Sequence, residues 1–243
     1  MAGTGRLRLL DALRGFSVLS MVAFHFCYDL KYIAGHPMAW FAPPFMDIWR
    51  SSISWTFLTI AGIMCAFSRN NFMRAGVYGA VAAGVWLVTT IAAVDAPISF
   101  GIIFCMAAST LFEALLEKAR LRPEGPLAAA LLFCAFLVAL GVPRGYIGLF
   151  GAHIELPDAL YATEYFSWLG LPGPTFVSGD YYPMIPFTLL FLAGAAIGWW
   201  GKRVGFPDFL YERGCAPLEF VGTHALPIYV LHQPVLLLVA NLF

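Results

Sequence analysis

Charged residues are scarce in this sequence. Asp, Glu, Lys and Arg make up 12% of the 243 residues, whereas hydrophobic residues make up 60% and the mean hydropathy is +0.79. Soluble domains carry about 25% charged residues, and no stretch here is long and polar enough to form one. The 14 basic and 14 acidic residues give a formal net charge of +0, so nothing suggests a nucleic-acid partner. The composition predicts a multi-pass helical membrane protein.

Cysteines are also few, and no standard catalytic signature is present. The five cysteines are odd in number, mostly lie in apolar segments and form no CxxC pair, which disfavours a disulfide framework or a zinc site. The sequence lacks a phosphate-binding loop, a nucleophile elbow, HExxH and a dinucleotide glycine fingerprint. We therefore predict no metal site, and any chemistry must come from polar residues within the membrane segments.

Long apolar runs predict about seven transmembrane helices, because a span needs about 20 apolar residues. The runs cover 9–33, 51–68, 75–94, 98–117, 126–142, 183–201 and 217–241. The N-terminus is basic and then apolar, but Asp11 and Arg14 interrupt it and no small-residue cleavage site follows. We expect a retained first helix in place of a signal peptide. The expected fold is all-α, a single polytopic domain over 1–243.

Basic residues predict the orientation of these helices. Only Lys31, Arg50 and Arg144 fall on one side of the predicted bundle, and the other eleven basic residues fall on the opposite side. By the positive-inside rule the N-terminus is cytoplasmic and the C-terminus is outside. The outer loops at about 34–50 and 143–182 are then long, and long loops on a compact bundle are often binding loops.

The first apolar segment carries two histidines. Ionisable groups in hydrocarbon are costly and usually face a bundle interior, a pathway or an active site. His36 follows His25 by 11 residues, about 16 Å along a helix that continues that far, and this spacing returns to nearly the same helix face. The pair is predicted to line one cavity. The alternative is a hydrogen-bonded core His25 and a helix-capping His36.

Two polar clusters are expected at the cytoplasmic side. Asp11 and Arg14 stand three residues apart and can pair on one helix face. They form either a snorkelling interfacial ion pair or a mouth that accepts an anionic ligand. Arg69 and Asn70 belong to the second cluster, where Arg suits phosphate, although short basic loops are also what the topology alone requires.

Two further places offer polar groups. Asp180 opens the sixth span, where it either caps that helix or holds a cationic substrate group, and Tyr181 beside it fits an interfacial belt or a substrate platform. In the last span, His224 and His232 are eight residues apart and are predicted to share a face, with Pro227 loosening the helix. Paired intramembrane histidines also fit haem ligation.

Small residues recur every four positions in two spans. The third span has Gly76, Ala80 and Gly84, and the sixth has Gly194 and Gly198. Such stripes let helices approach closely. They are expected to serve packing within the bundle, and they also permit a homodimer.

Several motifs in order along the chain resemble one family. RLRLLDALRGFSVLSMVAFHFCYDL, SWTFLTIAGIMCAFSRNN, PISFGII, DYYPMIPFTLLFLAGAAIG and LPIYVLHQPVLL are similar to the bacterial branch of the heparan-α-glucosaminide N-acetyltransferase catalytic-domain family, which belongs to a wider group of transmembrane acyltransferases. The resemblance covers nearly the whole chain, with 118–178 outside these motifs. It implies transfer of an acetyl group from cytoplasmic acetyl-CoA, across the membrane, to the amine of a glucosamine on the far side.

The resemblance also implies roles for particular residues. The family's lysosomal member uses an Asn in the first helix and a His 11 residues later, and the matching positions here are His25 and His36. His36 is then the expected general base, and His25 polarises the thioester carbonyl or orients His36. The expected donor-side residues are Asp11, Arg14, Arg69 and Asn70, and the expected acceptor-side residues are Asp180, Tyr181 and His232.

His in place of Asn at position 25 leaves the acceptor open. An amino-sugar or glycan amine is favoured, and O-acylation of a cell-surface sugar is the alternative. A non-enzymatic haem, quinone or transport protein using the same histidines ranks below both. The expected location is the bacterial inner membrane, with the lipid bilayer as a partner.

Overall fold

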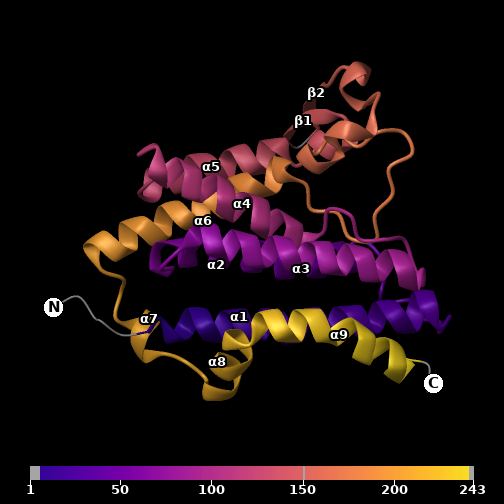
Figure 1. The fold of residues 1–243 in the computed structure, drawn as a ribbon, viewed down its shortest axis with the longest axis horizontal. Coiled ribbons are helices and arrows are strands. Elements are labelled where there is room, and N and C mark those ends of the chain that lie inside the picture. Colours follow the sequence, from indigo (N-terminus) through magenta and orange to yellow (C-terminus); the bar gives the residue numbers. More distant parts are fainter. Residues whose placement is uncertain (1–5, 150, 241–243) are drawn as a thin grey trace. The chain divides into compact units, whose positions relative to one another are not determined.

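The computed structural model of the chain describes residues 6–149 and 151–240. Within them the chain is mostly helical, with one small β-hairpin (Figure 1). It divides into two compact units, one made of residues up to 60 and from 205 onward, the other of residues 61–204. Helix α2 contains the boundary between them.

The first unit is built around the N-terminal helix. Its elements are α1 (Arg8–Tyr28), the π-helical turn Asp29–Ile33, α2 (Phe45–Ile63) up to residue 60, α7 (Phe209–Glu212), α8 (Ala216–Thr223) and α9 (Ala225–Ala240). Helix α1 packs against α8 and α9, and α9 runs alongside it (Figure 1). Trp49 Nε1 on α2 donates to Ser20 Oγ on α1 at 2.8 Å.

Glycines allow the backbones of α1 and α8 to touch. A Cβ at Gly15 would lie 1.9 Å from the carbonyl oxygen of Leu218, and one at Gly222 would lie 2.0 Å from that of Asp11. Only glycine leaves room for contact at that separation. This contact fixes the first half of α1 against α8, beside the ion pairs of Asp11 and Glu219.

The second unit is a helix bundle with an insertion. Its elements are the end of α2, the 3₁₀ turn Met64–Phe67, α3 (Asn71–Ala92), α4 (Ile102–Lys118), α5 (Pro126–Ala139) and α6 (Met184–Val204). Helix α3 packs on α4, and both α4 and α5 pack on α6. Helix α6 forms the centre, where Phe191 and Ala196 are fully buried.

The predicted loop 143–182 contains more structure than expected. Strands β1 (Tyr146–Leu149) and β2 (Ala152–Glu155) form an antiparallel hairpin with Tyr146 opposite Glu155. Short 3₁₀ turns follow at Asp158–Tyr161 and Glu164–Leu169. The all-α prediction missed the hairpin, because a pair of four-residue strands gives little periodic signal in sequence.

Four described helices are long and apolar enough to cross a membrane: Arg8–Ile33, Asn71–Ala92, Pro126–Arg144 and Met184–Val204. The bent pair Ala216–Thr223 and Ala225–Val239 gives a fifth if it counts as one span. The multi-pass prediction is confirmed. The seven-span count stays a prediction, since α4 has 17 residues and the first half of α2 contains Asp47, Arg50 and three serines. Position 241, the predicted end of the last span, lies outside the described residues.

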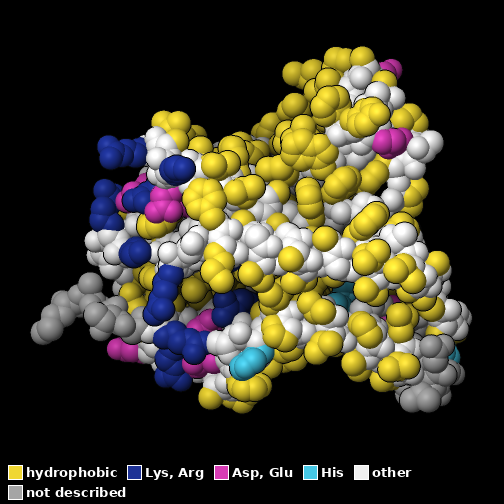
Figure 2. All heavy atoms as spheres, viewed as in Figure 1, with side chains coloured by type: hydrophobic (Ala, Val, Ile, Leu, Met, Phe, Trp, Pro, Cys, Tyr) yellow, Lys and Arg dark blue, Asp and Glu magenta, His cyan; other side chains and the backbone are white. Residues whose placement is uncertain are grey.

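The exposed faces of the helices are apolar, as lipid contact requires. Figure 2 shows hydrophobic side chains over much of the visible surface. On α3 the exposed residues include Trp86, Val88 and Ile91. A soluble helix would show charged residues on such a face, so this surface supports a membrane location.

The two small-residue stripes behave differently. A Cβ at Gly198 would lie 2.4 Å from the carbonyl oxygen of Ile63, so the prediction of close packing is confirmed there. A Cβ at Gly76 or Gly84 would meet nothing within 4 Å among the described residues. The α3 stripe is therefore exposed within its unit, and its use in a homodimer stays a prediction.

Basic side chains cluster within the second unit near the end of α6 (Figure 2). Lys202 Nζ donates to the carbonyl of Ala66 at 2.5 Å, and Arg203 pairs with Glu124 at 2.9 Å. The end of α6 therefore meets the turn after α2 and the loop after α4 at one end of this bundle, as the charge pattern predicted. Which side of the membrane this end faces stays a prediction.

Candidate active site

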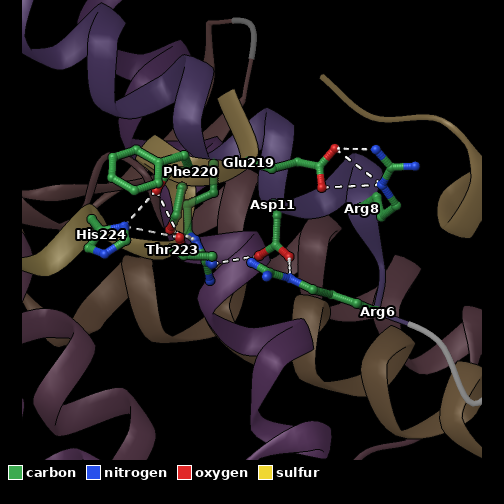
Figure 3. A network of polar contacts seen from close by, with 9 residues as sticks. Arg6, Arg8, Asp11, Glu219, Phe220, Thr223 and His224 are labelled. Carbon is green, nitrogen blue, oxygen red and sulfur yellow. Dashed lines mark hydrogen bonds and ion pairs between the residues drawn. The ribbon is translucent and has the colours of Figure 1, made fainter. Parts of the chain in front are cut away.

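The predicted ion pair at the start of α1 is present. Arg14 Nη2 donates to Asp11 Oδ1 at 2.6 Å, and Arg6 also donates to this buried carboxylate (Figure 3). Beside it, Arg8 pairs with Glu219 on α8 at 3.0 Å (Figure 3). The three-residue spacing placed Asp11 and Arg14 on one face, where Asp11 is buried and Arg14 is partly buried.

Arg14 has a second partner that the sequence did not indicate. Its Nε donates to the carbonyl oxygen of Gly222 at 2.5 Å, near the end of α8. The guanidinium thus joins α1 to α8 and has a packing role. A CoA phosphate at Arg14 would compete with these bonds, so donor binding by Asp11 and Arg14 stays a prediction.

Two of the predicted site histidines meet. The ring of His25 on α1 packs against the ring of His232 on α9, with ring centroids 4.9 Å apart and planes tilted by 58°. Nδ1 of His232 lies 2.6 Å from the carbonyl oxygen of Tyr229. Its Nε2 is buried and has no hydrogen-bond partner among the described residues. The fold therefore brings together a residue predicted to be catalytic and one predicted to bind substrate.

A second cross-helix pair lies beside the histidines. Nε2 of Gln233 donates to both carboxylate oxygens of Asp29, at 2.9 and 3.1 Å, and Asp29 is fully buried. His25 and Asp29 are four residues apart, hence on one side of the helix. Sequence reasoning gave Asp29 and Gln233 no role. An acidic residue inside an apolar segment was the available signal.

His36 does not continue the face of His25. Regular α-helix ends at Tyr28, the next five residues form a π-helical turn, and Gly35 adopts φ +77°. The backbone N–H of His36 bonds to the carbonyl of Leu30 at 2.9 Å, and the side chain is exposed. The shared face was predicted for a helix that continues to His36, and that prediction was wrong. The catalytic role of His36 stays a prediction.

In the last span, His224 and His232 also fail to share a face. His224 ends α8, and α8 and α9 are bent by 83° at this point. The physical reason is Pro227: it has no N–H to offer the carbonyl of Thr223, four residues earlier, so the helix breaks there. Pro227 thus interrupts the helix as expected, and the bend separates the two histidines.

Asp180 caps a helix, but a different one from that predicted. Its Oδ2 accepts from the backbone N–H of Ile102 at 3.1 Å, in the first turn of α4. The prediction of capping at α6 was wrong, because Tyr181 pairs with Phe100 and draws the carboxylate toward α4. The hydroxyl of Tyr181 donates to the carbonyl of Ser167 at 2.6 Å, and burial raises the pKa of this phenol.

Asn70 and Arg69 flank the start of α3. Oδ1 of Asn70 accepts from the N–H of Met73 at 3.0 Å, so this side chain is the helix cap. The Arg69 side chain is exposed. Capping accounts for Asn70, and an exposed guanidinium is available for an anion; binding of CoA by either residue stays a prediction.

The second unit also buries a carboxylate that sequence reasoning passed over. Glu113 on α4 is fully buried and accepts from Trp199 Nε1 at 2.7 Å and Asn71 Nδ2 at 3.2 Å. It ties α4 to α6 and to the start of α3. The signal was again an acidic residue within an apolar run.

The described residues contain no group of three or more His, Cys, Asp or Glu side chains able to hold a metal ion. Haem ligation by two histidines needs one on each side of the iron. The rings of His25 and His232 contact each other directly, so in this arrangement no iron fits between them.

These features define a multi-pass membrane protein with a polar site buried among its helices. The family model described as "Heparan-alpha-glucosaminide N-acetyltransferase, catalytic" matches residues 6–234. The chain therefore belongs to this family of membrane acetyltransferases. The match spans both units and includes His25, His36 and His232. No curated protein and no solved structure matches the chain.

Proposed function

We propose that this protein transfers an acetyl group from acetyl-CoA to the amine of an amino-sugar or glycan. The observation that carries the proposal is the family match over residues 6–234. The buried polar site on α1 and α9 supports it, because ionisable residues inside a membrane protein are costly and usually serve function. The proposed location is the bacterial inner membrane.

Acetyl-CoA is proposed to enter from the cytoplasmic side. Arg14 in the first unit, with its partner Asp11, and Arg69 with Asn70 in the second are the proposed contacts of the CoA phosphates. Arg suits phosphate because its planar fork donates two hydrogen bonds at once. The exposed Arg69 supports this role more directly than Arg14, which already serves Asp11 and Gly222.

The acceptor is proposed to enter from the outer side; its proposed contacts are His232 in the first unit, and Asp180 and Tyr181 in the second. Its amine nitrogen attacks the thioester carbonyl carbon, an N–C bond forms, the C–S bond breaks and the CoA thiolate leaves. His36 takes the proton from the amine as general base. His25 donates a hydrogen bond to the developing oxyanion, and its buried position strengthens that bond.

The first test is acetyl-CoA turnover by the full-length protein with glucosamine as the trial acceptor. Replacing His36 by Ala is expected to lower the rate on the order of 10²–10⁴-fold, because a general base contributes about that factor. The matched control is His224→Ala, an exposed histidine at the junction of α8 and α9. An unchanged rate in His36→Ala would reject this residue as the base.

The replacement of Asn by His at position 25 supports a second candidate, O-acylation of a cell-surface sugar. A hydroxyl is a weaker nucleophile than an amine and gains more from a second imidazole. Product chemistry distinguishes the two, since an ester is cleaved by mild base and an amide is not. Acetyl-CoA turnover that requires a hydroxyl acceptor and gives a base-labile product would replace the amine proposal.

A further inference from the structure

Two hydrogen-bond acceptors are left over between α1 and α9. Nε2 of His232 and Oε1 of Gln233 are buried, and neither has a partner among the described residues. A buried acceptor without a donor has lost its water and gained nothing in return. Such atoms are rare in native structures, and each is explained by a bound water or ion, by a ligand or by a catalytic role.

The protonation of His232 follows from its other nitrogen. Nδ1 lies 2.6 Å from the carbonyl oxygen of Tyr229, which can only accept, so Nδ1 carries the proton. In the neutral ring Nε2 then has a lone pair and no hydrogen. His232 therefore presents an acceptor that its own helix holds in orientation.

The amide of Gln233 is oriented in the same way. Its Nε2 donates to both oxygens of the Asp29 carboxylate, and a carboxylate offers only acceptors to that nitrogen. The amide oxygen is thereby turned away from Asp29. Like Nε2 of His232, this oxygen can accept a hydrogen bond and has no donor among the described residues.

We propose that His232 and Gln233 form an acceptor pair that binds the primary amine of the acetyl acceptor. The inference rests on the proposed function and assigns the residues that recognise its amine. The two residues are adjacent on α9, and their partners His25 and Asp29 lie on one side of α1. Two acceptors match the two N–H bonds of a primary amine, whereas a hydroxyl carries one hydrogen and would leave one acceptor unpaired.

The acceptor pair fits the neutral amine. An ammonium has no free lone pair, so it first loses one proton to solvent; the two N–H bonds that remain can then pair with Nε2 of His232 and Oε1 of Gln233. The second proton leaves as the N–C bond forms and the C–S bond breaks; it passes to His36 and then to the CoA thiolate. One acetyl-CoA therefore yields one amide, one CoA thiol and one net proton.

The test measures KM for glucosamine and for acetyl-CoA separately in the full-length protein. His232→Phe keeps the ring volume against His25 and removes Nε2, and it is expected to raise the KM for glucosamine by about tenfold or more, with the KM for acetyl-CoA within about twofold. Gln233→Met removes Oε1 and is expected to act in the same direction. His232→Gln restores an amide oxygen and is expected to recover part of the loss. His224→Phe is the matched control.

An unchanged KM for glucosamine in both His232→Phe and Gln233→Met would overturn the pair, as would an equal rise in the KM for acetyl-CoA. If thermal unfolding shows that His232→Phe does not fold, His232→Gln and Gln233→Met carry the test. If the wild type does not turn over acetyl-CoA, the proposed function fails, and direct titration with glucosamine and glucose decides the pair. Binding of glucosamine over glucose that depends on His232 supports it, and equal or absent binding overturns it.

Discussion

The Glu164 side chain joins two parts of the segment between α5 and α6 through its bonds to Thr175. Its Oε1 accepts from the hydroxyl of Thr175 at 2.8 Å and from the backbone N–H of the same residue at 2.9 Å. These bonds favour the ionised carboxylate and lower the pKa of Glu164 below its ordinary value. A lowered pKa means that the contact stabilises the folded loop above the ordinary carboxyl pKa and is lost as pH falls through the folded value.

We therefore expect hydrogen exchange in the segment around Thr175 to speed up, after correction for intrinsic rates, as the pH falls from about 6 to 3. Glu164→Gln keeps an acceptor oxygen but no longer titrates, so its corrected exchange should be the same at both pH values. Glu155→Gln in the hairpin is the control and should follow the wild type. Wild-type exchange that ignores pH would show that the carboxylate does not hold this loop.

At the residue scale, the spacing of residues in the sequence predicts contacts within one helix, but it does not predict contacts between helices. The three-residue spacing of Asp11 and Arg14 predicted their pairing correctly, because both lie within one regular helix. Asp180 was predicted to cap the helix that follows it in sequence, and it caps α4, some 80 residues earlier in the chain. Its partner depends on which segments run side by side, which local sequence does not encode.

At the scale of elements, the π-helical turn after α1 changes which residues share a helix face. The π-helical turn Asp29–Ile33 bonds each residue to one further away than an α-helix does. The faces predicted from 3.6 residues per turn stop being valid beyond it. His25 and Asp29, before and at the start of the turn, keep their common side; His36, after it, does not share that side.

The close contact between the end of α2 and α6 is possible because residue 198 is a glycine and has no side chain. A Cβ at Gly198 would sit 2.4 Å from backbone of Ile63, and backbone cannot rotate out of the way. We expect Gly198→Ala to destabilise the protein by about 1–3 kcal/mol, as overpacking typically does. Gly84→Ala on α3 is the control, since its Cβ would meet nothing within 4 Å.

Thermal unfolding of both variants in the same detergent measures the difference. Gly84→Ala is expected to match or slightly exceed the wild type, because alanine favours helix over glycine by about 1 kcal/mol. Equal loss of stability in the two variants would contradict the assigned packing. A change of oligomeric state in a bulkier variant, Gly84→Leu, would support the use of this stripe in a homodimer, which the sequence permits.

Orientation in the membrane is a property of the whole molecule, and two exposed sites report on it. Cys215 follows the basic loop after α6, which the positive-inside rule places in the cytoplasm, and its side chain is exposed. Thr163 is exposed in the segment between α5 and α6, on the predicted outer side. We expect a membrane-impermeant maleimide to label Thr163→Cys in intact cells and to label Cys215 only after the membrane is opened.

Labelling is read by mass spectrometry of peptides, with Cys215→Ser in the background of Thr163→Cys so that each site is measured alone. Cys134 on the apolar face of α5 serves as the lipid-facing reference and should react slowly in both conditions. Labelling of native Cys215 in intact cells would reverse the proposed topology. Equal labelling of both sites from one side would contradict the span count between them.

The sequence by itself determined the membrane class, the positions of the apolar helices and the polar residues worth testing. These follow from composition and periodicity, which act locally along the chain. Only the tertiary structure decided which polar residues meet: His25 with His232, and Asp29 with Gln233, each pair separated by more than 200 residues. Periodicity fixes which face of a helix is polar, but the partner of that face depends on how helices rotate and pack, and on breaks such as the π turn and Pro227.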